Sequence, residues 1–316
     1  MRVAFQVMGV TAGRKDSNCE ILLKEALLAC REQGAEVRMI NLKDYELLDC
    51  NGCTACTMGM SMGKNTGCSL ADKDDKQKIM DVMLEQDAVI FSAPTYDLMP
   101  SSLFLKFMHR NLAYESAFLT KIGAIAPRDR VGALIAVGGS TRSWQSMALE
   151  CMQATTFTNS FKIVDTYMAT QVPAPAQVLL YEEKVARVRE MGLNVMKALN
   201  TPPAERKWLG DPDYGWCPNC HSNALCLGEP QWKGLQYPIE CVVCGAGGTL
   251  EQTEDGRWKF VIAENGLERD RTTEEGRGVH CDEIAETQGG FFMDPAKRQL
   301  VPERLPKYQS IQFPGI

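Results

Sequence analysis

Eight of the 13 cysteines in this 316-residue chain form two quartets with different spacing. The first quartet is a C-x2-C-x2-C-x11-C run made of Cys50, Cys53, Cys56 and Cys68. The second is a C-x2-C-x20-C-x2-C arrangement made of Cys217, Cys220, Cys241 and Cys244. Three closely spaced cysteines with a fourth nearby are typical of a loop around an iron–sulfur cube. Two CxxC pairs are typical of a single tetrahedral ion. The spacing therefore predicts two different metal centres.

For the first quartet we expect four thiolates on a 4Fe–4S cluster. Four thiolates in one short loop repel each other unless a cation neutralises them, and this favours a bound metal. The alternative is a set of free or disulfide-switching thiols.

For the second quartet we expect zinc. A zinc ribbon fits the spacing and would stabilise a module too small to fold alone. The alternative is a rubredoxin-like Fe(Cys)4 centre, whose two CxxC pairs usually lie further apart in the sequence.

Composition places the chain among ordinary globular proteins, with 45% hydrophobic and 23% charged residues. No window approaches 18 consecutive apolar residues, so we expect neither a signal peptide nor a membrane span, and a cytoplasmic location. In that compartment CxxC pairs are better explained as metal ligands or redox thiols than as disulfides.

The net charge of −6 is concentrated near the carboxyl terminus. Residues 205–316 hold 12 Lys and Arg against 18 Asp and Glu, so residues 1–204 are neutral overall. A nucleic-acid surface needs a basic stripe, so we expect no nucleic-acid partner.

Residues 1–204 alternate apolar runs with amphipathic stretches. Strands are predicted at residues 2–8, 35–42, 88–92, 132–137 and 161–168, and helices at 17–33, 74–85, 101–111, 143–159 and 182–199. This alternation predicts an α/β fold in which a doubly wound, five-stranded parallel sheet is covered on both faces.

The composition changes after Pro202 and Pro203, which end the last of these helices. Residues 205–316 are rich in Gly, Pro, Cys and aromatics, and we expect a small β-rich module stapled by metal. Residues 300–316 contain three prolines, and we expect them to form an extended tail packed on a neighbour.

Three loops follow predicted strands on the edge of the sheet where doubly wound folds bind ligands. Residues 9–18 run into a helix amino terminus, which is a site for a phosphate ester. Residues 92–99 offer the aromatic face of Tyr96, and the glycines of residues 137–141 allow close approach of a flat ring. Together the loops predict a planar, phosphorylated cofactor.

Four further residues belong with these loops and the first quartet: Asp74, Asp75, Lys106 and Arg110. With all of these motifs, residues 1–200 resemble the flavodoxin-like NADPH-dependent FMN reductase family. Within that family they most resemble the iron–sulfur flavoproteins. The resemblance implies an FMN whose phosphate is held by Thr11, Ser17 and Asn18. It also implies that the flavin ring lies along Pro94, Thr95, Tyr96, Asp97, Leu98, Gly138, Gly139 and Ser140. It further implies a homodimer or homotetramer.

We therefore expect a flavin-dependent oxidoreductase. It would transfer electrons between a donor such as NAD(P)H or ferredoxin, FMN, a 4Fe–4S cluster, and an acceptor or small organic substrate. One alternative is a non-enzymatic electron carrier that docks a redox partner through the acidic module. A weaker one is a redox-responsive zinc-ribbon regulator. No side chain stands out as a catalytic residue.

Overall fold

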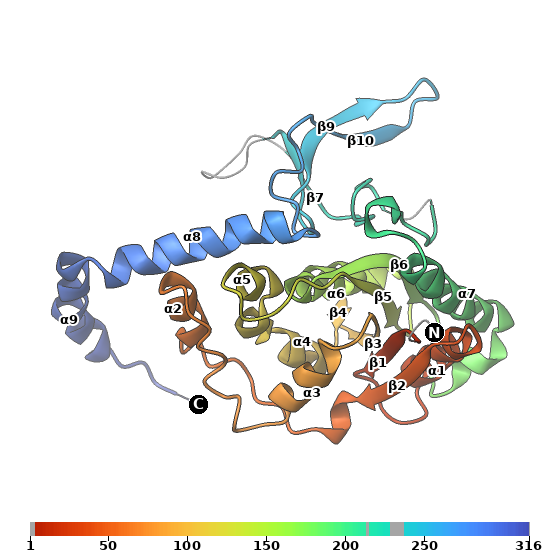
Figure 1. Ribbon diagram of the computed structural model, residues 1–316, viewed down its shortest axis with the longest axis horizontal. Helices are drawn as coiled ribbons and strands as arrows, with labels where there is room; N and C mark the ends of the chain where they lie inside the picture. Colours follow the sequence, from red (N-terminus) through yellow and green to blue (C-terminus); the bar gives the residue numbers. More distant parts are fainter. Residues whose placement is uncertain (1–3, 213–214, 228–236, 316) are drawn as a thin grey trace.

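The first module is built on a parallel sheet. A computed structural model describes residues 4–212, 215–227 and 237–315 (Figure 1). Five parallel strands lie in the order β2-β1-β3-β5-β6, and the two-residue β4 pairs antiparallel with β3. The strands are β1 (Gln6–Thr11), β2 (Glu36–Asn41), β3 (Ala88–Tyr96), β4 (Met99–Pro100), β5 (Arg130–Val137) and β6 (Phe161–Ala169). The predicted five-stranded parallel sheet is confirmed.

Helices cover both faces of this sheet, as its apolar strands require. On one face α1 (Asn18–Glu32) and α7 (Glu182–Leu199) share a hydrophobic core with β5. On the other face the core is completed by α3 (Lys76–Met83), α4 (Ser102–Met108) and α6 (Ala148–Thr156). The short helices α2 (Ala55–Ser61) and α5 (Ser116–Lys121) were not predicted.

The second module is a four-stranded antiparallel sheet in the order β10-β9-β8-β7. Its strands are β7 (Leu225–Leu227), β8 (Ile239–Cys241), β9 (Gly247–Gln252) and β10 (Trp258–Ile262). The small β-rich module is therefore confirmed. The 3-10 turn Pro203–Glu205 spans the expected boundary with the first module, which stays a prediction.

The expectation of an extended carboxyl-terminal tail is wrong for most of its length. Residues beyond the small sheet form α8 (Glu274–Phe292) and α9 (Pro295–Gln309). The Asp294 carboxylate caps α9 by accepting the N–H groups of Ala296 and Lys297. Pro295 occupies the first turn, where its missing N–H is not needed, while Pro302 and Pro306 lie inside the helix. Proline was therefore a poor guide to where this segment stops being helical.

Helix α8 joins the two modules. It runs from the small sheet across α5 and α2 (Figure 1). Its Cys281 is buried with Met60, Phe118 and Leu119 of these helices in one hydrophobic cluster. The carboxyl-terminal module therefore packs on the segment that carries the first cysteine quartet. Within the described parts of the chain, no helix is both long and apolar enough to cross a bilayer.

Gly192 sets the distance between α1 and α7. A Cβ at this position would overlap the carbonyl oxygen of Ala26. The Cys30 thiol of α1 donates to the Gly192 carbonyl oxygen at 3.4 Å. The backbones of the two helices therefore touch, which only glycine permits here.

We predict that Gly192→Ala destabilises the protein by about 1–3 kcal/mol, because the helices must separate. Gly290→Ala in α8 is the matched control, because a Cβ there meets nothing within 4 Å. Its better helix propensity should stabilise the protein by up to about 1 kcal/mol. Thermal or denaturant unfolding measures both, and equal effects would contradict the close packing of α1 and α7.

Candidate functional site

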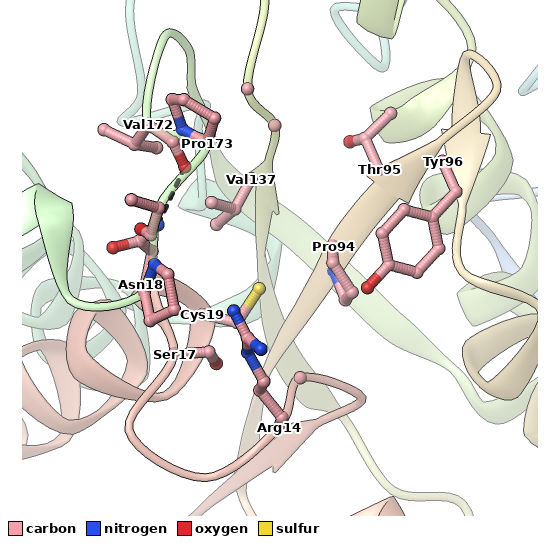
Figure 2. A pocket seen from close by; sticks show the side chains of 15 residues that line it. Arg14, Ser17, Asn18, Cys19, Pro94, Thr95, Tyr96, Val137, Val172 and Pro173 are labelled. Carbon is pink, nitrogen blue, oxygen red and sulfur yellow. Dashed lines mark hydrogen bonds between the residues drawn. The ribbon is translucent and has the colours of Figure 1, made fainter.

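A cavity opens at the carboxyl ends of β1, β3 and β5 (Figure 2). The three predicted loops and the helix start that follows the first of them contribute to its lining: Gly13, Arg14, Ser17, Asn18 and Cys19, then residues 94–96 and 137–139. A fourth wall, residues 172–175 after β6, was not predicted. The loops meet because parallel strands end on the same edge of the sheet, where doubly wound folds place their ligands.

Seven of the eleven predicted cofactor residues line this cavity: Ser17, Asn18, Pro94, Thr95, Tyr96, Gly138 and Gly139. The other four do not line it: Thr11, Asp97, Leu98 and Ser140.

The first loop is organised around a helix cap. The Ser17 hydroxyl accepts the N–H of Glu20 at 3.4 Å and caps α1. Thr11 is fully buried, and its hydroxyl accepts the N–H of Gly13 at 3.1 Å. Thr11 therefore shapes the loop, while Gly13 and Ser17 face the cavity at the helix amino terminus. This is the position at which backbone N–H groups and the helix dipole favour a phosphate.

Asn18 joins the first loop to the fourth wall. Its Nδ2 donates to the carbonyl oxygens of Val172 and Ala174 at 2.8 and 2.9 Å. Its Oδ1 accepts the N–H of Val178 at 3.0 Å. The side-chain amide is thus used within the protein, and Asn18 positions a wall of the cavity.

Arg14 was not selected from the sequence, although the basic pair Arg14 and Lys15 in the loop was a signal. Its exposed side chain lies at the cavity lining, near Cys19 and Ser17 (Figure 2). Of the ion pairs formed by the described residues, none involves Arg14. Its guanidinium is therefore available to a phosphate, which it matches in charge and geometry.

Gln145 links the two loops on the far side of the cavity. The Thr95 hydroxyl donates to its Oε1 at 3.3 Å, and its Nε2 donates to the carbonyl oxygen of Ser140 at 3.1 Å. A Cβ at Gly138 would overlap this buried amide, and one at Gly139 would crowd Pro173. Bare backbone therefore borders the cavity here, which suits close approach of a flat ring.

Asp97 and Leu98 form the turn between β3 and β4. Both have positive φ, 47° and 73°, the conformation of a type I′ hairpin turn. The carbonyl oxygen of Leu98 accepts the N–H of Met147 at 3.1 Å, which fixes the turn against the start of α6. Tyr96 lies at the rim of the cavity and is 65% exposed. An anion site at one end and bare backbone at the other fit FMN.

The four cysteines of the first quartet line a second cavity, together with His109 and Arg110. Among the described residues, only the second quartet brings its ligand atoms within 4.8 Å of one another. The sulfurs of the first quartet are thus spread around a space and not gathered on one point. A cube of four irons holds its thiolates further apart than a single ion does, so this arrangement fits a cluster.

Thiolate character is already favoured at one ligand. Cys53 Sγ lies 2.9 Å from the Ser69 hydroxyl, and this hydrogen bond lowers the pKa of Cys53. Burial raises the pKa of Cys56. Arg110 contacts the Cys68 sulfur from the floor of the cavity. The quartet therefore offers both exposed and half-buried ligands.

Helix α4 connects the two cavities. At its start the N–H of Ser101 donates to the carbonyl oxygen of Pro94 at 2.8 Å, beside the first cavity. Just beyond its end, His109 and Arg110 line the second cavity. Seven helical residues rise by about 10 Å, so the two sites are neighbours within one module.

The second quartet has the geometry of a single-ion site. All four cysteines are buried. The Sγ atoms of Cys217 and Cys244 are 3.6 Å apart, and so are those of Cys220 and Cys241. A tetrahedral ion with bonds of about 2.3 Å to sulfur requires about 3.8 Å between sulfurs.

Two matching knuckles hold these cysteines. In one, the N–H of His221 donates to the carbonyl oxygen of Cys217 at 2.8 Å; in the other, the N–H of Gly245 donates to that of Cys241 at 2.9 Å. His221 and Gly245 both have positive φ, 58° and 83°. The same tight turn therefore follows each CxxC pair.

The second quartet also fastens its module to α6. The Gln153 side chain donates to the carbonyl oxygen of Cys220 at 2.7 Å, and the Glu150 carboxylate accepts the N–H of Asn223 at 3.3 Å. The His221 ring stacks on Trp208 with centroids 4.3 Å apart. Loss of the knuckle would therefore disturb the interface between the modules.

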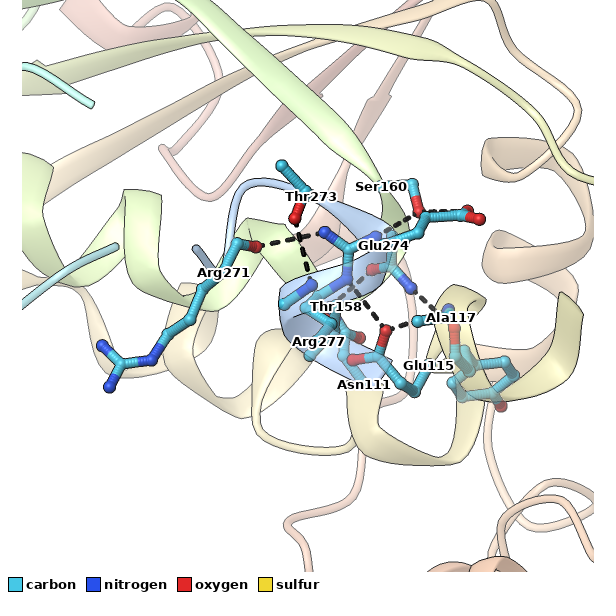
Figure 3. Close-up of polar contacts among 12 residues, drawn as sticks. Asn111, Glu115, Ala117, Thr158, Ser160, Arg271, Thr273, Glu274 and Arg277 are labelled. Carbon is cyan, nitrogen blue, oxygen red and sulfur yellow. Dashed lines mark hydrogen bonds and ion pairs between the residues drawn. The ribbon is translucent and has the colours of Figure 1, made fainter. Parts of the chain in front are cut away.

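A buried ion pair anchors α8 on the other side of this interface (Figure 3). Arg277 Nε donates to Glu115 at 3.1 Å, and its Nη2 donates to the Ser160 hydroxyl at 2.7 Å. Its Nη1 donates to the carbonyl oxygen of Arg271 at 3.1 Å. Burial raises the pKa of Glu115 to about 7 despite this cation. The ion pair fixes where α8 leaves the small sheet.

We predict that Cys220→Ser loses the bound metal and several kcal/mol of stability, because metal binding is part of the folding free energy at such sites. Cys226→Ser is the control, because Cys226 lies on β7 outside the quartet. Metal analysis and thermal unfolding measure both variants. Retention of metal and full stability by Cys220→Ser would contradict a four-ligand structural site.

Comparison with known proteins adds three relatives. A flavone synthase from Aspergillus candidus is 25% identical over 278 residues, covering 83% of both chains. An iron–sulfur flavoprotein from Methanocaldococcus jannaschii is 31% identical over 147 residues, covering 46% of this chain and 68% of that one. The solved structure of a flavone reductase superposes over 99% of both chains, with a TM-score of 0.72 and 22% identity, and so shares the fold of both modules.

The family model described as NADPH-dependent FMN reductase matches residues 7–173. That range is more than half of the chain, and it includes the first loop, the loops after β3 and β5, and the start of the fourth wall. It also contains the whole first quartet. The chain therefore belongs to the NADPH-dependent FMN reductase family and is a flavin-dependent oxidoreductase.

Proposed function

We propose that this oxidoreductase uses FMN to reduce or oxidise a planar aromatic substrate, with a 4Fe–4S cluster in the first quartet relaying single electrons. The observation that carries the proposal is the pair of cavities at the two ends of α4. One has the lining expected for FMN, and the other is lined by four cysteines. NAD(P)H or a ferredoxin-like protein is the expected donor.

The residues of the first cavity have distinct parts in this proposal. Arg14 and the amino terminus of α1 bind the phosphate, and Asn18 holds the fourth wall in place. The backbone at Gly138 and Gly139 lets the ring approach, and Gln145 fixes the loops beside it. When bound, FMN supplies hydride and single-electron chemistry.

The substrate class is supported by the cavity rim and by the relatives. Tyr96 is 65% exposed, and Trp144, next to Gln145 in the sequence, is 67% exposed. Exposed aromatic rings of this kind favour stacking with a flat, conjugated molecule. The relative and the solved structure that extend over the second module are named as a flavone synthase and a flavone reductase. A flavone-like conjugated ketone is therefore the proposed substrate class.

For the second quartet we propose zinc with a structural role. The close sulfurs and the buried knuckles suit one ion of fixed charge. Iron would be accepted by the same four thiolates, so metal analysis decides between zinc and iron.

A homodimer or homotetramer is also proposed. The apolar side chains of Leu98 and Met99 are exposed beside the flavin cavity, and this supports a subunit contact there.

The proposal is tested by anaerobic purification followed by an absorption spectrum and analysis of iron, zinc, sulfide and flavin. NAD(P)H oxidation is then followed with a flavone, and with its saturated analogue as the control. We expect one FMN, four irons per chain in the first site, and turnover that depends on the conjugated double bond. A flavin band without iron would contradict the cluster. No flavin after FMN addition would contradict the main proposal. Reduction by a redox protein without turnover of flavones would favour an electron carrier.

We predict that Arg14→Ala weakens FMN binding about 10- to 100-fold, because one charge-assisted hydrogen bond contributes about 1.5–3 kcal/mol. Riboflavin, which lacks the phosphate, should bind the variant and the wild type equally. Lys15→Ala is the matched control, because Lys15 is also an exposed base in the loop but does not line the cavity. Titration by flavin fluorescence measures all three proteins, and an equal loss of FMN and riboflavin would contradict phosphate binding by Arg14.

A further inference from the structure

A buried guanidinium lies against one ligand of the first quartet. The Nε and Nη2 atoms of Arg110 both lie 3.4 Å from the Cys68 sulfur, so two N–H groups donate to it. The Arg110 side chain is only 2% exposed. Its Nη1 pairs with Asp74 and donates to the carbonyl oxygen of Leu48 at 3.3 Å. Arg110 is thus held in place with one edge turned to the sulfur.

The carboxylate behind Arg110 is completely buried. Asp74 accepts the N–H of Leu48 at 2.7 Å and the N–H of Lys76 at 3.3 Å, besides its ion pair with Arg110. These bonds lower the pKa of Asp74 against the opposing effect of burial. The pair Arg110–Asp74 is therefore a fixed charge pair oriented with its positive end toward Cys68.

A second basic side chain lies behind the same quartet. Lys76 is fully buried, and its Nζ donates to the carbonyl oxygen of Phe107 and, at 2.5 Å, to Oδ1 of Asn111. The Phe107 ring lies 4.1 Å from this nitrogen. In the part of the chain that the structure describes, no carboxylate pairs with Lys76. Burying a basic side chain without an anion is costly, and this burial lowers the pKa of Lys76 well below its ordinary value.

These charges bear on how a bound cluster takes up an electron. The potential of an iron–sulfur cluster depends on its net charge, on hydrogen bonds to its sulfurs and on burial. Reduction adds one negative charge to the cluster. The two N–H donors of the charged Arg110 guanidinium on a ligand sulfur stabilise that extra charge more than they stabilise the oxidised cluster.

We propose that Arg110 is a positioning residue that orients Cys68 and raises the reduction potential of the cluster held by the first quartet. The inference rests on the cluster of the proposed function. The step is the transfer of one electron from the reduced flavin to the cluster. No bond forms or breaks, and Arg110 keeps its protons throughout.

The experiment is a redox titration of the full-length, anaerobically purified protein, monitored by electron paramagnetic resonance. Arg110→Gln should make reduction at least tenfold less favourable, a shift of 59 mV or more to negative potential for one electron. Arg110→Lys, which keeps the charge but not the paired donors, should shift the potential less in the same direction. Asp74→Asn removes a negative charge and should shift it in the opposite direction.

Arg187→Lys is the matched control, because Arg187 pairs with Asp165, another fully buried aspartate far from the quartet in the sequence. It should change stability without changing the potential. A purely structural role for Arg110 also predicts lower stability, but no ordered shift of potential among the variants. The opposite signs expected for Arg110→Gln and Asp74→Asn are therefore the decisive readout.

The possible failures are distinguishable. A wild-type protein without a cluster would overturn the cluster of the proposed function and this inference with it. If the wild-type protein holds a cluster but Arg110→Lys and Asp74→Asn have the same reduction potential as the wild type, this inference alone would be overturned. If Arg110→Gln binds no cluster, Arg110→Lys and Asp74→Asn still decide, because both keep the charge or the donors that face Cys68.

Discussion

The position of β3 between β1 and β5 is the constraint on which the site depends. Parallel pairing in this register brings Thr11 beside Ser92, and Pro94 beside Val137, so three loops leave the sheet at one edge. The same strand continues through Pro94 to α4, whose far end reaches the first cysteine quartet. One buried strand therefore sets both the shape of the flavin cavity and its distance from the quartet.

The second module contributes to this arrangement by packing, although its quartet lies outside both cavities. Its knuckle is fastened to α6, and its helix α8 covers α2, which carries Cys56. Met60 of α2 and Cys281 of α8 are buried in the same cluster. Ordering of the first quartet's loop is thus coupled to a module whose own stability is expected to depend on metal. This gives a physical reason for one chain to hold two unlike cysteine sites.

Strong periodic signals made the sheet and the long helices that flank it predictable, and the spacing of the cysteines distinguished the two quartets. The fourth wall of the cavity was not predictable in this way, because Asn18 holds it through contacts more than 150 residues away in the sequence. Arg14 resembled any exposed basic residue until the cavity was visible beside it. Helices α8 and α9 were missed because they carry glycines and prolines without an apolar stripe, and α8 is held by tertiary contacts such as Arg277 with Glu115. Local patterns do not report such distant partners.

The two quartets differ most in the charges that surround them. The second is buried, and its turns are closed by backbone hydrogen bonds, which suits an ion whose charge never changes. The first leaves Cys50 and Cys53 exposed, while Arg110 lies buried behind it and donates to the Cys68 sulfur. A buried positive charge behind the ligands would contribute little at a site whose ion never changes its charge. It matters for a centre whose charge alternates by one, since it stabilises one of the two states more than the other. The surroundings, more than the spacing, therefore support the proposed division of the two quartets into a structural site and a redox site.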